Sequence, residues 1–488
     1  MVESLLRRLE AGARRWPERR ALVWEGGALT HAELHALAVS SAARLAARGV
    51  GPGARVALVM PNSWAFAGAL LAGWKLGATV APLDPRLTSE ERRAILADLA
   101  PTVTLEERDI DRPAGREALR ASGAQGGDVP TAGGTIDAPA LILYTSGSTG
   151  RPKGAVISHA ALASANESWA EPVMALTPED VVLAALPLSH SFGLNGALLA
   201  PLRTGASVVL LERFSPEAAL DAIRRHRVTV FPAVATMFRR ILDSSELTRS
   251  SVGSLRLAVS GAAPCPWELA EEWRRRTGVR ILRGYGMTEL FRPISCLASD
   301  TSESPAAVGR AVPGVEVTIV DEGGRPRPAG EVGDLWIKSP HAMESYLNSP
   351  EETREVLTGD GWFRTGDLAR VAGDGSVEII GRKRERILRG GYSVFPAEVE
   401  AVLFTHPAVA EAAVIGVPHR ELGEEVAAFV TLKPNASARP DELVTHCRER
   451  LAGFKYPRQV TILPALPKSA TGKILKASLL PARRAARG

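Results

Sequence analysis

Residues 141–159 read LILYTSGSTGRPKGAVISH, an apolar run followed by hydroxyls that alternate with glycines up to Lys153. The apolar run, 141–144, is typical of a strand. Glycines let backbone N–H groups turn toward a polyanion, hydroxyls donate further hydrogen bonds, and one ammonium supplies positive charge. The stretch therefore predicts a phosphate-binding loop that comprises Thr145, Ser146, Gly147, Ser148, Thr149, Gly150 and Lys153.

This loop differs from a Walker A loop. Lys153 follows Pro152 rather than glycine, and it precedes Gly154 rather than serine or threonine. Residues 154–157 predict a second short strand, and the next serine predicts the N-cap of a helix over 159–170. The phosphates would thus be bound between two strands, in a fold of another kind.

Residues 144–154 resemble the signature of the adenylate-forming superfamily, which includes acyl-CoA synthetases, peptide-synthetase adenylation domains and beetle luciferases. The resemblance extends over about 18–479. It implies an α/β fold with a large N-terminal domain of layered subdomains and a small, mobile α+β C-terminal domain. It also implies ATP, Mg²⁺ and CoA as the molecules that the protein uses.

Length and composition are consistent with this fold. A chain of 488 residues is too long for one hydrophobic core, and 45% apolar with 23% charged residues is ordinary for a soluble globular protein. A net charge of +5 is mild, and basic runs with interleaved aromatics are absent from the sequence, so we expect no nucleic-acid partner. The resemblance leaves open whether the protein forms a homodimer.

Sequence features also predict where the protein works. The first twenty residues mix glutamates with arginines and predict an amphipathic surface helix rather than a signal or transit peptide. The most membrane-like stretch, 64–77, is too short to span a bilayer and contains Lys75, so it predicts a buried helix. Three widely spaced cysteines fit a reducing compartment. We therefore expect a cytoplasmic protein without a membrane span.

Short β-rich runs alternate with helical ones from the start of the chain. Strands are predicted over 55–60 and 79–82, and helices over 63–77 and 89–99. This alternation predicts layers of helices on largely parallel sheets. Residues 106–137 have little periodicity and predict an exposed connection to the phosphate-binding loop.

The segment PLSHSFG at 187–193 follows a predicted strand and precedes an apolar helix. His190 could cap this helix. The resemblance instead places it in the acyl pocket and near the reacting groups, and we favour that role. The implied pocket residues are chiefly apolar or small: His190, Phe192, Phe231, Val259 and Gly286.

The pocket segments contain no acidic residue that could bind an α-amino group, so amino-acid activation is disfavoured. Arg292 could meet a second carboxylate, but a surface salt bridge is the favoured interpretation. The identity of the acid stays open at this point.

The sequence GYGMTE at 284–289 is the next specific motif. The ring of Tyr285 can stack on adenine, Thr288 can donate to the α-phosphate, and the Glu289 carboxylate can bind Mg²⁺. The resemblance assigns the adenine and AMP contacts to Gly261, Ala262, Ala263, Gly284, Tyr285, Gly286 and Met287, and catalytic roles to Thr288 and Glu289.

Two later segments complete the nucleotide site. A carboxylate can accept hydrogen bonds from both hydroxyls of a ribose, and the resemblance gives this role to Asp367, with Arg382 adding contacts. Arg384 occupies the hinge position, where Asp or Lys is more usual. We therefore expect domains over 1–381 and 387–488 with a hinge at 382–386.

The small domain carries two further motifs. Arg389, Gly390 and Gly391 resemble the segment that lets the backbone approach the pantetheine arm of CoA. Residues 467–474 resemble the C-terminal motif whose catalytic lysine is Lys473. The resemblance implies that an acid is joined to AMP first and that, after the small domain rotates, a thiol displaces the AMP.

The first interpretation is therefore an acyl-CoA synthetase that acts on a hydrophobic acid. The alternative within the superfamily is a stand-alone ligase that loads the phosphopantetheine thiol of a carrier protein. A third hypothesis, from another class, is a nucleotide-binding sensor that has lost catalysis. The presence of Lys473, Glu289 and Asp367 together disfavours it.

Overall fold

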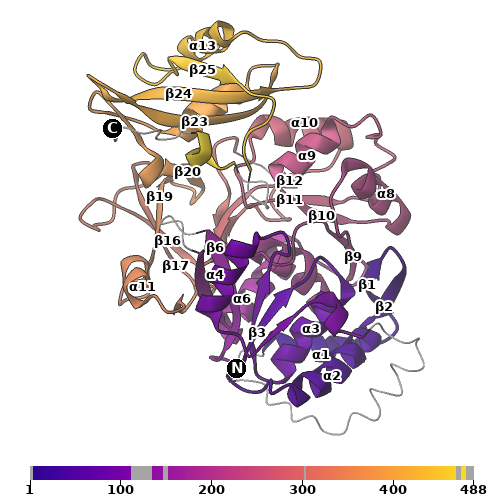
Figure 1. Cartoon of the computed structure of the whole chain (residues 1–488). Coiled ribbons are helices and arrows are strands. Elements are labelled where there is room, and N and C mark those ends of the chain that lie inside the picture. The colour runs from indigo at the N-terminus through magenta and orange to yellow at the C-terminus, as the bar shows by residue number, and fades with distance from the viewer. Residues whose placement is uncertain (1–3, 112–134, 147–151, 302–303, 469–473, 480–488) are drawn as a thin grey trace.

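The computed structural model describes residues 4–111, 135–146, 152–301, 304–468 and 474–479 (Figure 1). Two large sheets with helices between and around them form the N-terminal part. Smaller antiparallel sheets follow, and the C-terminal sheet lies at the end opposite the N-terminal helices. The α/β class expected from the alternation of strands and helices is confirmed.

The first large sheet has six strands: four neighbours are mutually parallel, and two more strands extend the edge beside β6 through antiparallel pairings. The predicted phosphate-binding segment falls between strands β6 and β7, which pair antiparallel, so the predicted position between two strands is confirmed. The strand order is β18 (Ser345–Tyr346), β7 (Pro152–Ser158), β6 (Pro139–Ser146), β4 (Thr79–Leu83), β3 (Arg55–Val59) and β5 (Val103–Leu105).

The second large sheet has seven strands, parallel except for the hairpin β1–β2. Its carboxyl ends carry the predicted pocket and adenine segments, as expected where ligands bind open α/β sheets. The order is β12 (Ile281–Leu282), β11 (Leu257–Ser260), β10 (Val230–Ala233), β8 (Val181–Ala184), β9 (Ser207–Leu210), β1 (Arg20–Trp24) and β2 (Gly27–Thr30).

Helices bury both faces of these sheets. The main apolar core contains side chains from both large sheets and from the helices that they enclose, and a second core lies beneath α8, α9 and α10. The helices are α1 (Leu5–Arg15), α2 (His31–Ala47), α3 (Trp64–Lys75), α4 (Ser89–Leu99), α6 (His159–Ser168), the π-helical η2 (Trp169–Val173) and η3 (Phe192–Leu199), α7 (Ala200–Thr204), α8 (Pro216–His226), α9 (Ala235–Leu242) and α10 (Trp267–Thr277).

Antiparallel sheets follow the second large sheet. Three strands, β13 (Gly284–Met287), β14 (Phe291–Ser295) and β15 (Arg310–Ala311), carry the GYGM segment. Four strands, β16 (Glu316–Val320), β17 (Val332–Lys338), β19 (Phe363–Val371) and β20 (Val377–Arg382), carry the predicted ribose residue. The short helix α11 (Pro350–Val356) lies between β18 and β19 in the chain.

The C-terminal sheet has its own apolar core. It is formed by β22 (Tyr392–Val394), β21 (Ile387–Arg389), β24 (Gly423–Leu432) and β23 (Val409–His419), with β25 (Gln459–Ile462) beside β24, and it is covered by α12 (Pro396–Phe404) and α13 (Pro440–Arg448). The small α+β unit predicted after the hinge is present. Across the described residues, no helix is long and apolar enough to cross a membrane.

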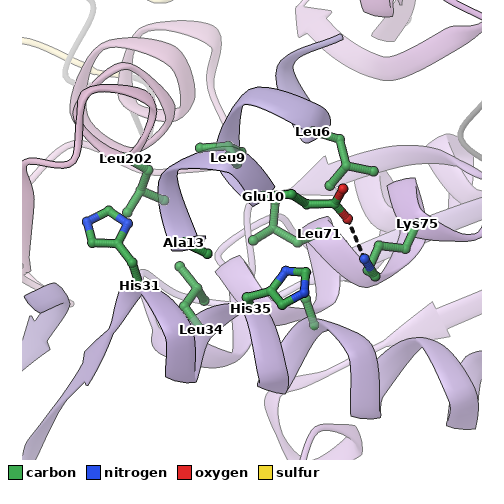
Figure 2. Close-up of a pocket in the computed structure, with 11 residues that line it drawn as sticks. Leu6, Leu9, Glu10, Ala13, His31, Leu34, His35, Leu71, Lys75 and Leu202 are labelled. Carbon is green, nitrogen blue, oxygen red and sulfur yellow. Dashed lines mark hydrogen bonds and ion pairs between the residues drawn. The ribbon is translucent and has the colours of Figure 1, made fainter. Parts of the chain in front are cut away.

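A buried ion pair fastens the first helix to the core. Figure 2 shows Glu10 of α1 facing Lys75 of α3, with His35 of α2 beside them, around a cavity of ≈ 20 Å³. Lys75 is 4% exposed. The predicted amphipathic helix and the predicted buried helix are therefore joined by charge as well as by apolar packing.

Glu10→Gln is expected to lower the free energy of unfolding by about 3 kcal/mol, because it leaves the Lys75 ammonium buried without its carboxylate. Chemical denaturation measures the change. Glu331→Gln is the matched control, since the Arg327–Glu331 pair is exposed and its loss should cost far less. Equal losses in the two variants would contradict the expected role of the buried pair.

Candidate active site

Asp367 lies at the centre of a polar cluster, although it is only 3% exposed. The pairing of β19 with β20 places it opposite Arg382, whose Nε lies 3.3 Å from its Oδ1. Tyr285 of β13 donates its hydroxyl hydrogen to Oδ2 at 2.5 Å. The structure thus brings together three residues that the sequence predicted for nucleotide binding.

Neighbouring groups fix the position of Asp367, and an open depression lies beside it. Its backbone N–H donates to Thr365 Oγ1 at 3.1 Å, which fixes the turn. Burial and the negative charge of Asp367 raise the pKa of Tyr285 well above its usual value, so this phenol stays protonated. An open depression of ≈ 340 Å³ adjoins the cluster and is lined by Thr365, Gly366, Arg382, Lys383 and Arg384.

Glu289, the predicted magnesium ligand, is buried and bound by a residue that the sequence did not reveal. Tyr346 of β18 donates to Glu289 Oε1 at 2.7 Å. The backbone also joins the two segments, because the Met343 N–H donates to the Glu289 carbonyl at 2.8 Å. Tyr346 lies 57 positions from Glu289 and belongs to no motif, so no sequence signal pointed to this contact. It depends on the tertiary position of β18, which pairs with β7.

Lys153 lies beside Tyr346, the residue that binds Glu289. Its ammonium lies 2.6 Å from Glu352 of α11 and 5.4 Å from the centre of the Tyr346 ring. The predicted phosphate-binding lysine and the predicted magnesium ligand therefore contact the same tyrosine, and the lysine is paired with an acid in this structure. Predicted residues Gly147, Ser148, Thr149, Gly150 and Lys473 lie outside the described residues.

The remaining predicted nucleotide residues lie at strand ends or in short strands. Thr145 and Ser146 end β6, Gly261, Ala262 and Ala263 follow β11, Gly284, Tyr285, Gly286 and Met287 form β13, and Thr288 comes directly after it. These segments lie in three different sheets.

His190 lies two residues before η3, close to Asp84 and Arg86, which follow β4 of the first large sheet. Its Nε2 is 3.9 Å from Asp84 Oδ2, and Asp84 is held by two hydrogen bonds from the Arg86 guanidinium. Burial lowers the pKa of His190, against the opposing effect of Asp84. Asn62 positions the loop before His190 by accepting from the Leu188 N–H at 2.9 Å.

Two of the predicted acyl-pocket residues, Phe192 and Val259, belong to the same apolar core. Phe192 stacks on Trp169 with ring centres 5.3 Å apart, and both belong to the main core with Val259. A Cβ placed on Gly261 would come within 2.9 Å of the Phe192 ring. Gly286 is the exposed residue of β13, and a Cβ there would meet the backbone of Phe291.

Phe231 is not part of this group. Alternate residues of a strand point to opposite faces, so Val230 faces the main core while Phe231 enters the core beneath α8–α10. There it packs edge-on against Phe238. The sequence-based assignment of Phe231 to the pocket is therefore replaced by a structural role.

Arg292 is also placed differently from expectation. It is 4% exposed, and among the described residues no carboxylate lies within ion-pair distance of it. The surface salt bridge favoured from the sequence is therefore wrong. The guanidinium lies over the Trp169 ring, 5.1 Å from its centre, beside the residues predicted to bind the acid.

The predicted CoA segment lies on the β21–β22 turn of the C-terminal sheet. Gly390 and Gly391 adopt φ values of +56° and +84°, which favour glycine. The Arg389 guanidinium is engaged by Glu425 at 2.5 and 3.0 Å. Arg384 lies in the 3₁₀ turn Lys383–Glu385, between the four-stranded sheet and this one.

Comparisons with known proteins extend over nearly the whole chain. The pattern of the AMP-binding enzyme family matches residues 9–347, and that of the AMP-binding enzyme C-terminal domain matches 398–473. Feruloyl-CoA synthase of an Amycolatopsis species is 37% identical, covering 94% of this chain and 97% of its own.

Two further proteins are similar to the chain over its length. The 3-[(3aS,4S,7aS)-7a-methyl-1,5-dioxo-octahydro-1H-inden-4-yl]propanoyl:CoA ligase of Mycobacterium tuberculosis is 36% identical, covering 96% of this chain and 97% of its own. The crystal structure of the anthranilate CoA ligase AuaEII in complex with anthranoyl-AMP has a TM-score of 0.89 at 30% identity, covering 98% of this chain and 96% of its own.

Proposed function

The chain belongs to the AMP-binding enzyme family, and on this basis we propose that it is an AMP-forming acyl-CoA synthetase. It activates a carboxylic acid with ATP as an acyl-AMP, releases pyrophosphate, and transfers the acyl group to the thiol of CoA. The observation that carries this proposal is the buried Asp367 carboxylate held between Tyr285 and Arg382.

The chain's own residues divide the work of the first step. Asp367 accepts hydrogen bonds from the ribose hydroxyls, and Thr288 donates to the α-phosphate. The phosphate-binding loop with Lys153 binds the other phosphates. Lys473 provides positive charge between the incoming carboxylate and the α-phosphate. Catalysis then consists mainly of positioning and charge stabilisation.

Glu289 suits Mg²⁺. One of its oxygens accepts from Tyr346, and the other has no hydrogen bond among the described residues, so it is left for a cation. Mg²⁺ commonly takes one or two protein carboxylates and completes its shell with phosphate oxygens and water. When bound, the ion would neutralise charge on the phosphates of ATP.

The acid is hydrophobic in this proposal, since the predicted pocket residues Phe192 and Val259 belong with Trp169 to one apolar core. The names of similar proteins, feruloyl-CoA synthase and anthranilate CoA ligase, specify aromatic acids. We therefore propose that the substrate is an aromatic carboxylic acid.

The second step requires a different arrangement of the two parts of the chain. We place the large domain at 1–381, the hinge at 382–386 with Arg384 as its pivot, and the small domain at 387–488. Rotation would withdraw Lys473 and present Gly390 and Gly391 to the pantetheine arm. Because Arg389 is paired with Glu425, the glycines rather than this guanidinium would contact CoA.

A pyrophosphate-release assay with a panel of acids, followed by detection of acyl-CoA, tests the proposed function. Hydrophobic monocarboxylic acids should be used far better than malonate, because the pocket offers apolar surface. Release of pyrophosphate without acyl-CoA, but with transfer to a phosphopantetheinyl carrier protein, would instead support the carrier-loading alternative. No release with any acid would overturn the proposal and favour a sensor.

Tyr346→Phe is expected to slow pyrophosphate release about 10-fold and to raise the Mg²⁺ concentration needed for half-maximal activity. It removes one hydrogen bond to the charged Glu289, worth about 1.5 kcal/mol. Tyr144→Phe is the matched control. It removes a similar hydrogen bond, 2.8 Å long, from a tyrosine hydroxyl to Asp98, and this bond does not involve Glu289. An unchanged Mg²⁺ requirement in Tyr346→Phe would contradict the positioning role.

A further inference from the structure

Arg292 is a charged side chain buried at the wall of the predicted acyl pocket. Its Nε donates to Ser295 Oγ at 2.8 Å, its Nη1 to the Ser260 carbonyl at 2.7 Å, and its Nη2 to the Leu282 carbonyl at 3.3 Å. The three acceptors come from β14, β11 and β12. The guanidinium is therefore held in one position between two sheets.

The charge of Arg292 is only partly compensated. A guanidinium has five N–H donors, so the three acceptors leave two N–H groups unmatched among the described residues. All three acceptors are uncharged, and a buried charge without an opposite charge is costly. Burial lowers the pKa of Arg292 to about 10, so it still carries its charge at neutral pH.

Two glycines beside Arg292 leave space for its guanidinium close to the predicted pocket. A Cβ on Gly284 would lie 2.3 Å from Cζ of Arg292, and a Cβ on Gly261 would lie 3.3 Å from Nη1. Gly284 directly precedes Tyr285, and a Cβ on Gly261 would also come within 2.9 Å of the Phe192 ring. Glycine at these two positions lets the guanidinium reach the segments that are predicted to bind AMP and the acid.

We propose that Arg292 recognises an oxygen acceptor at the end of the acyl substrate remote from the reacting carboxylate. The substrate class is an apolar, aromatic-sized acid that carries a second carboxylate or a carbonyl there. This inference rests on the proposed function. Such a group would meet the unmatched N–H donors, and a carboxylate would also supply the missing negative charge. Trp169, beneath the guanidinium, would support its plane.

Acids of matched shape test this inference. Benzoates, phenylacetates and phenylpropanoates with a para carboxylate, acetyl or isopropyl group differ in oxygen acceptors but little in volume. In the series whose length fits, an acceptor-bearing acid should exceed its isopropyl analogue about 10- to 100-fold in kcat/KM for pyrophosphate release. Isopropyl acids that are equal or better in all three series would overturn the inference.

Variants show whether the preference comes from Arg292. Arg292→Met should abolish the preference while retaining activity with the isopropyl acid, and Ser295→Ala, which removes the acceptor of Nε, should weaken it. A folded Arg292→Met that loses activity equally with every acid would overturn the inference and assign Arg292 a structural role. If Arg292→Met does not fold, Ser295→Ala decides, and an unchanged preference in that variant would overturn the inference.

The same assays distinguish failure of this inference from failure of the proposed function. If no acid in any series releases pyrophosphate, the protein is not an acyl-CoA synthetase for such acids. If pyrophosphate is released without regard to the distal group, only the role of Arg292 is refuted.

Discussion

Asp367→Ala should raise the KM for ATP about 100-fold or more. Two hydrogen bonds from ribose hydroxyls to a charged, buried carboxylate are lost, each worth about 1.5–3 kcal/mol. Steady-state pyrophosphate release at varied ATP concentration measures the effect. An unchanged KM for ATP would refute the ribose assignment.

Asp334→Ala is the matched control for this variant. Asp334 lies on the neighbouring strand β17 and forms an ion pair with Lys383 at 2.8 Å, near the same depression. It should leave the KM for ATP nearly unchanged. Asp367→Asn separates charge from shape, because the amide oxygen can still accept from Tyr285 while the negative charge is removed.

Lys473→Ala should lose pyrophosphate release but retain the thioester step. One preorganised cation at the α-phosphate contributes roughly 3–4 kcal/mol, or about 100- to 1000-fold in rate. The second step starts from a formed adenylate, so the variant should convert synthetic acyl-AMP and CoA to acyl-CoA at nearly the wild-type rate. Lys468→Ala is the control from the same segment, since Lys468 is paired with Glu411 at 2.5 Å.

Gly391→Leu should show the opposite pattern, with adenylation intact and CoA transfer lost, because a bulky side chain would block the thiol. The φ of +84° strains any side chain there, so Gly391→Ala serves as the control with similar strain but little bulk. If Lys473→Ala and Gly391→Leu each lost both half-reactions equally, alternation between two domain orientations would be refuted.

Local sequence was sufficient for the parts of this protein that depend on local chemistry. Glycines, hydroxyls and lysine in 144–154 predicted a loop between two strands, and the structure has β6 and β7 at its ends. Alternating apolar runs predicted the large sheets. The roles of residues 284–289 and of Asp367 were assigned by the resemblance to the adenylate-forming superfamily, and the structure brings Tyr285 and Asp367 into hydrogen-bond contact.

Contacts between distant segments required the tertiary structure. Periodicity shows that alternate strand residues face opposite sides, but the packing of α8–α10 determines which side holds Phe231. Tyr346 reaches Glu289 through β18, and Arg292 is buried because three strands from two sheets supply its acceptors. Burial and charge pairing depend on everything that packs around a side chain, so no single stretch of sequence could specify them.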